Sequence, residues 1–141
     1  MRCCKGLVVG AALILGACTN TYHISGMFEG STQVFQGTVS VGLGQSGSLD
    51  VSSVDGAVQC TGTSEVTQLP SGYSTIGAQG IAEATCTDGR SFKVDFVQTR
   101  SSGGHGQGID NAGRIVQLYF DMSEGTVQSM LERHQLNTLV Q

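Results

Sequence analysis

Along most of the chain, short segments carry apolar and polar residues at alternating positions. In one of them Phe92, Val94 and Phe96 fall on one face, whereas Lys93 and Asp95 fall on the other. This period of two is typical of a strand with one buried face. The segments predicted as strands by this pattern and by their β-branched and aromatic residues are 32–35, 37–41, 48–52, 57–61, 78–86, 91–98 and 115–121, and the Gly-rich segment 101–108 is expected to be a flat strand or a turn.

Turn signals separate these segments. Asp55-Gly56, Asp88-Gly89 and the run 111–113 each bring an Asp or Asn close to a Gly just before a strand-like segment. Glycine adopts positive φ at little cost, so these sites predict tight hairpins. The polar faces of the strands argue against a parallel sheet buried on both sides. We therefore expect a mainly β fold, a small antiparallel sandwich or barrel-like meander of roughly six to eight short strands.

The hydrophobic period changes near the C-terminus. Val127, Met130, Leu131 and His134 are spaced by three and four residues, which is the apolar stripe of a helix. The Asp-Met-Ser-Glu run just before them has the spacing of a capping box. These features predict an amphipathic helix over 123–137 that packs on the sheet or covers an open end.

The N-terminal segment 1–17 has the three parts of a secretory signal. Arg2 and Lys5 give a positive start, residues 6–15 form an uncharged apolar run, and small residues precede Cys18. A helix that spans a membrane needs about 20 apolar residues, and this run is about half as long. We therefore expect the segment to be an export signal that is removed.

The run Leu15-Gly16-Ala17-Cys18 resembles the lipobox of bacterial lipoproteins. The resemblance implies that a peptidase cuts before Cys18 and that its thiol carries a diacylglyceryl group, with the new amino group acylated, for example by palmitate. Two or three such chains hold a protein stably on a membrane. Thr19 follows the cysteine where the family's inner-membrane members have Asp, which implies the outer membrane, on its periplasmic or surface face, if the host has two membranes.

The remaining chain is long enough for one domain. Residues 18–30 show no clear hydrophobic period and are expected to be a lipid-anchored tether. A single β-rich domain that includes the C-terminal helix is expected over 31–141.

Charge excludes one class of partner. The chain carries a net charge of −4, and loss of Arg2 and Lys5 with the signal brings it to −6. Lys93 is the one lysine left in the sequence, so there is no basic stripe for nucleic acid and no polybasic patch for lipid headgroups. An acidic surface suits a basic protein partner in the envelope.

The cysteines fall into three groups. Cys3 and Cys4 leave with the signal, Cys18 is the predicted lipid attachment site, and Cys60 and Cys86 remain as a pair. A single pair in an oxidising compartment predicts a structural disulfide. The alternatives are a redox pair, for which the spacing is too wide, and a zinc pair, for which no histidine lies nearby in the sequence.

Two glycine motifs resemble ligand loops. Residues 42–47 match G-x-G-x-x-G, but a strand-like segment follows where a dinucleotide site requires a helix. Residues 103–110 are similar to the calcium-binding nonapeptide repeats of β-helices, but Gly108 replaces the required Asp and the segment occurs once. We interpret the first as a hairpin tip and the second as a loop or Gly-rich strand, and we expect no cofactor.

No local motif indicates catalysis or metal binding. His23, His105 and His134 have no second ligand at metal-binding spacing, and no nucleophile elbow is present in the sequence. Carboxylates that could pair for acid–base chemistry are Asp50, Asp55, Glu65, Glu83, Asp88 and Asp95.

The anchor, the disulfide and the lack of a catalytic motif favour a non-enzymatic envelope lipoprotein, either a binding module or a structural one. Its expected partners are the membrane, through Cys18, and a protein of the envelope. One alternative is an inhibitor of a lysozyme-like envelope enzyme, by analogy with small disulfide-bridged β lipoproteins. The other is a small envelope hydrolase, which a deep pocket holding His105 with Asp110 or another carboxylate would favour.

Overall fold

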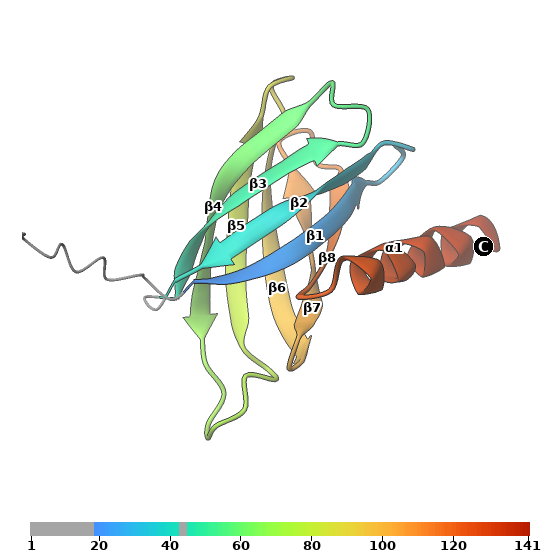
Figure 1. The fold of residues 1–141 in the computed structure, drawn as a ribbon. Coiled ribbons are helices and arrows are strands. Elements are labelled where there is room, and N and C mark those ends of the chain that lie inside the picture. Colours follow the sequence, from blue (N-terminus) through green and yellow to red (C-terminus); the bar gives the residue numbers. More distant parts are fainter. Residues whose placement is uncertain (1–18, 43–44) are drawn as a thin grey trace, which may run out of the picture.

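The computed structural model describes residues 19–42 and 45–141. Eight antiparallel strands follow one another around a closed barrel, and one helix packs against its outer surface (Figure 1). This confirms the predicted fold class in its barrel form. The strands are β1 (Asn20–Phe28), β2 (Val34–Val41), β3 (Ser46–Ser53), β4 (Gln59–Gln68), β5 (Gln79–Cys86), β6 (Ser91–Arg100), β7 (Gly103–Asp110) and β8 (Ile115–Asp121), and the helix is α1 (Glu124–Leu139).

The predicted tether over 18–30 is wrong for most of its length. Residues Asn20–Phe28 form β1, which pairs with β2 on one side and with β8 on the other and so closes the barrel. The inward positions of β1 hold Gly26 among larger apolar residues, and Met27 occupies an outward one. Gly26 and Met27 interrupt the alternation of apolar and polar residues, so the sequence pattern does not predict this strand. With β1 included, the domain begins near residue 20 instead of residue 31.

The predicted hairpin turns are present. Gly56, Gly89 and Gly113 have φ angles of 75°, 89° and 80°, values that favour glycine over residues with a Cβ. Each lies in a short connection between successive antiparallel strands. The 42–47 motif forms the β2–β3 connection and leads into a strand, although its residues 43 and 44 lie outside the described ranges.

The core fills the barrel interior. It consists of aliphatic side chains, phenylalanines and the Cys60–Cys86 disulfide, which joins directly paired positions of β4 and β5 as the sequence predicts. The Gly-rich segment expected as a strand or turn is β7. An eight-stranded barrel is just wide enough for its side chains to fill it, or to hold one small ligand.

Helix α1 packs its first turns against β1 and β8 from outside, and its C-terminal part extends away from the barrel (Figure 1). Val127 and Leu131 are its buried residues, and they belong to the predicted apolar stripe. The capping differs from the prediction, because Ser123 makes no side-chain cap bond and the Ser123 N–H instead donates to Asp121 Oδ1 at 2.9 Å. No helix among the described residues is long and apolar enough to cross a membrane.

Candidate functional site

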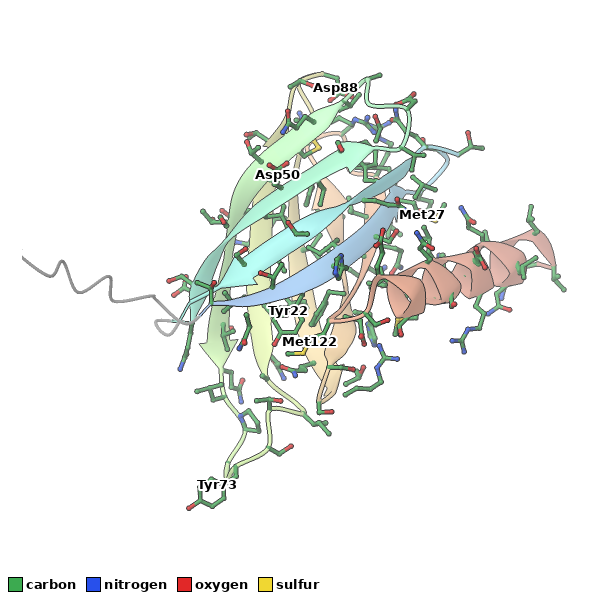
Figure 2. The ribbon with its side chains drawn as sticks, in the orientation of Figure 1. Tyr22, Met27, Asp50, Tyr73, Asp88 and Met122 are labelled. Carbon is green, nitrogen blue, oxygen red and sulfur yellow. A yellow bond between two sulfur atoms is a disulfide. The ribbon has the colours of Figure 1, made fainter. Side chains whose placement is uncertain are left out.

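The two ends of the barrel differ in construction. The turn end carries the β1–β2, β3–β4, β5–β6 and β7–β8 connections, and the mouth end carries the β2–β3, β4–β5 and β6–β7 connections. Figure 2 shows Asp88 at the turn end and Tyr73 on the long β4–β5 loop at the mouth end. β1 begins and β8 finishes at the mouth end (Figure 1).

Aromatic rings and an arginine fill the turn end. Phe28 packs edge-to-face against Phe35 and Phe92, with ring centroids 5.3 and 5.9 Å apart. The Arg90 guanidinium lies 4.4 Å from the centroid of Phe28, which is within the range of a cation–π contact. Its side chain is only 13% exposed. This end is therefore sealed by packed side chains.

Hydrogen bonds hold the arginines in place. Arg90 donates from Nε to Asp88 Oδ2 at 2.7 Å and from Nη2 to Gln33 Oε1 at 2.9 Å. Arg114 donates from Nε to Asp110 Oδ2 at 2.8 Å. The bond from Arg90 holds the pKa of the Asp88 carboxyl below its usual range.

Asp110 is buried in the turn that carries Arg114. Burial by itself raises the pKa of Asp110, but hydrogen bonds from the backbone N–H groups of Arg114 and Ala112 and from the Arg114 guanidinium outweigh it. The resulting pKa is below the ordinary value for Asp. Both carboxylate oxygens therefore accept hydrogen bonds within the turn, which favours the charged form.

The mouth end contains an apolar cavity of about 80 Å³. None of the described side chains around it is charged, and the most polar are a tyrosine, a serine and a glutamine. The lining residues are Tyr22, Ile24, Val39, Val41, Leu49, Ser64, Val66, Ala82, Phe96, Gln98, Leu118 and Phe120.

Small side chains on β4 and β5 leave this space open. Ser64 and Ala82 are opposite each other in the β4–β5 register and both line the cavity. Next to them Gly80 gives room for the ring of Phe96, since a Cβ at Gly80 would meet that ring and the carbonyl oxygen of Glu65. Ser64 Oγ is buried and has no hydrogen-bond partner among the described residues.

Three aromatic rings border the cavity. Tyr22 and Phe120 meet edge-to-face with centroids 5.9 Å apart, and Phe96 meets Phe120 in the same way at 5.6 Å. Tyr22 and Phe96 are only partly buried, which places them at the rim. Figure 2 shows Tyr22 at the lower end of the barrel wall. The rim is therefore apolar with one phenol group.

The volume limits what the cavity can hold. Pockets for drug-sized ligands enclose about 300–1,000 Å³, and an engineered apolar cavity of about 150 Å³ binds benzene. The present cavity of about 80 Å³ therefore has room for a group of a few carbon atoms, such as the end of an alkyl chain, and the remainder of a larger ligand would stay outside.

The histidines lie outside the barrel interior. His105 on β7 and His134 on α1 lie near the ring of Tyr119, with centroids 6.5 and 6.0 Å from it. Burial raises the pKa of the Tyr119 phenol. His23 is on β1, beside the first turn of α1. Among the described residues no group of three His, Cys, Asp or Glu side chains could hold a metal ion.

The structure does not bring His105 and Asp110 together as a hydrolase would require. His105 is exposed on the outer face of β7, whereas Asp110 is buried at the end of that strand and pairs with Arg114. The carboxylates named in the sequence analysis are all exposed, on outward strand positions or in turns: Asp50, Asp55, Glu65, Glu83, Asp88 and Asp95.

The predicted lipidation site Cys18 and the predicted signal 1–17 lie outside the described residues. The mouth cavity was not among the features predicted from the sequence. A signal for it was present, because Gly80, Ala82 and Ala84 are small residues at every second position of one strand. Small inward residues on a barrel strand leave space that the opposite wall must fill.

No family model, no curated protein and no solved structure matches this chain. A proposal for the function of this protein therefore rests on the geometry of the barrel.

Proposed function

We propose that this protein is a lipid-anchored lipoprotein of the bacterial envelope, and that its barrel is a non-enzymatic binding module which holds the apolar end of a ligand at its mouth. The observation that carries the proposal is the uncharged cavity of about 80 Å³ at the mouth end. The turn end, by contrast, is filled by Phe28, Phe35 and Arg90.

The chemistry of the lining defines the ligand class. An alkyl or other apolar group gains about 0.8 kcal/mol for each CH₂ that it buries. A charged group would lose its hydration without a partner of opposite charge, because the described lining holds no ionised side chain. The bound group is therefore apolar, and the lining includes one buried polar atom without a hydrogen-bond partner among the described residues, Ser64 Oγ.

The location in this proposal rests on the sequence. The basic start, the apolar run and the lipobox-like run that finishes at Cys18 support export and lipid anchoring, to the outer membrane if the host has two membranes. The disulfide between Cys60 and Cys86 is typical of an oxidising compartment such as the periplasm. The acidic net charge favours a basic protein over nucleic acid as any macromolecular partner.

Calorimetric titration with straight-chain alkanols of increasing length tests the binding site. A soluble form that begins at Thr19 is used, so that no lipid competes for the cavity. We expect affinity to rise by about fourfold with each added methylene and then to level off once the cavity is full. Equal affinity for all lengths, or no measurable binding, would contradict the proposal.

A blocking variant locates the binding. Ala82→Leu adds carbon atoms where Ala82 lines the cavity and is expected to remove most of the affinity. Thr85→Leu is the matched control, because Thr85 lies on the same strand but is exposed on the outer face. If both variants bind alkanols alike, the ligand is bound elsewhere.

A further inference from the structure

The β4–β5 connection is the longest loop that extends from the mouth end (Figure 1). It exposes three large apolar side chains: Leu69 and Ile76 are 54% and 51% exposed, and Tyr73 at the tip is completely exposed. In Figure 2 Tyr73 points away from the barrel, into open space. Apolar side chains grouped on one protruding loop are typical of a surface that contacts another apolar phase.

The loop lies in an uncharged part of an acidic chain. Between Glu65 and Glu83 the sequence contains no Asp, Glu, Lys, Arg or His. The exposed carboxylates Asp55 and Asp88 are in the turns at the opposite end, and Glu65 on β4 precedes the loop. The loop itself can therefore contact a zwitterionic surface without burying a charge.

Hydrogen bonds fix the loop to the barrel. Gln98 Nε2 on β6 donates to Thr75 Oγ1 at 2.9 Å and to the Ser101 carbonyl at 3.1 Å. The Gly77 N–H donates to the Gln98 carbonyl at 2.7 Å. The part of the loop around Ile76 is thus held against β6, so contact through it does not require this part to be ordered first.

The predicted anchor emerges at the same end. Cys18 is two residues before Asn20, the first residue of β1, and two residues span at most about 7 Å. An acylated Cys18 therefore holds the mouth end close to the lipid. In the strand order β4 and β5 lie well around the barrel from β1, so the anchor and the loop are separate points on one rim.

We infer that the β4–β5 loop, residues 69–78, contacts the lipid bilayer and that the mouth of the barrel faces the membrane. Leu69 and Ile76 enter the boundary between headgroups and acyl chains. Tyr73 lies at the headgroup level, where the ring of a tyrosine contacts apolar groups and its hydroxyl can form hydrogen bonds. The inference rests on the lipid anchor of the proposed function. It adds an orientation in which the cavity opens toward a layer rich in alkyl chains.

Fluorescence tests this orientation directly, because the chain contains no tryptophan. The full-length lipidated protein carrying Tyr73→Trp is reconstituted into phosphatidylcholine vesicles whose acyl chains bear bromine, a quencher of indole emission. We expect the emission to shift to shorter wavelength and to lose intensity relative to vesicles without bromine. Val54→Trp is the matched control, because Val54 is 68% exposed in a turn at the opposite end, and its emission should remain that of an indole in water.

Flotation of the same vesicles separates the two proposals. Full-length protein that floats, with Tyr73→Trp quenched and Val54→Trp unquenched, supports the inference. Protein that floats while both reporters behave alike overturns the orientation but leaves the anchor intact. Protein that does not float, or that floats equally well as Cys18→Ser, overturns the lipid anchor and the inference that rests on it.

Discussion

Ser64 on β4 and Ala82 on β5 are directly paired across the two strands, and both side chains line the cavity at the mouth of the barrel. This pair of small residues accounts for much of the open space. Ser64 also leaves a hydroxyl group buried without a hydrogen-bond partner among the described residues. An unsatisfied buried polar group costs about 1–3 kcal/mol. Ser64 is therefore expected to lower the free energy of unfolding.

Ser64→Val should stabilise the protein by about 1 kcal/mol, because it removes the unpaired hydroxyl and fills part of the cavity. The same change should weaken alkanol binding. Urea denaturation measures the free energy of unfolding, and calorimetry measures the binding. Ser48→Val is the control, since Ser48 is exposed on β3 and its replacement should change the stability by less than about 0.5 kcal/mol. A destabilised Ser64→Val protein with unchanged binding would contradict the described cavity.

Arg90→Met should destabilise the protein by about 2 kcal/mol. The change removes the cation–π contact with Phe28 and the charge-assisted hydrogen bond to Asp88. It also removes the hydrogen bond that Arg90 donates to Gln33. Lys93→Met is the comparison, because the Lys93 side chain is 59% exposed and its ion pair with Glu83 lies on the surface. Similar chemical denaturation midpoints for the two variants would show that Arg90 does not seal the barrel.

Removal of the disulfide by Cys60→Ala together with Cys86→Ala should lower the stability by about 3.5 kcal/mol. The chain-entropy model gives this value for a loop of the size closed here, in which the two cysteines are 26 residues apart. Thermal melting of the variant measures the effect, and the wild-type protein melted in dithiothreitol should match it. If reductant leaves the melting temperature unchanged, the bond does not contribute to the stability of the barrel.

Acid should destabilise the barrel through its turn carboxylates. The pKa values of Asp55, Asp88 and Asp110 are lowered from the ordinary 3.8 by hydrogen bonds within the turns. A group whose pKa is depressed in the folded state stabilises that state above its unfolded pKa, and this contribution is lost as the pH falls through the folded value. We therefore expect stability from these groups to be constant near neutral pH and to decline below 3.8.

Asp110→Asn tests this assignment. The variant removes the charged partner of Arg114 and should be less stable than wild type at neutral pH. The difference between the two should narrow in acid, because Asp110 of the wild type is then protonated. Melting temperatures measured from neutral pH downward would give parallel curves if Asp110 had no part in the acid response.

Most of the strands after residue 33 follow from local sequence, but the second half of β4, which continues to Gln68 beyond the predicted 57–61, and the closure of the sheet do not. Alternation at residues such as Phe92 and Val94 and the glycine turns at Gly56 and Gly89 predict the hairpins, because these signals act over a few residues. Closure depends on β1, where Gly26 interrupts the apolar pattern, and on its pairing with a strand at the other end of the chain. That pairing has no local signal in the sequence.

The mouth cavity could be predicted only in part. The small residues at alternate positions of β5, such as Gly80 and Ala82, show that space is available. Whether that space stays empty depends on how far the rings of Phe96 and Phe120 reach across the barrel. This is a matter of packing between non-adjacent strands, which the sequence pattern leaves open.

The pairing of β1 with β8 also sets the order of assembly. β1 is made first and its second partner, β8, is made last among the strands. Until β8 is available, the sheet has two unpaired edges, to which other chains could add. If the chain is exported and acylated as proposed, it would remain tethered beside the membrane as an open sheet during this interval. Its yield would then depend on protection of those edges as well as on the stability of the finished barrel.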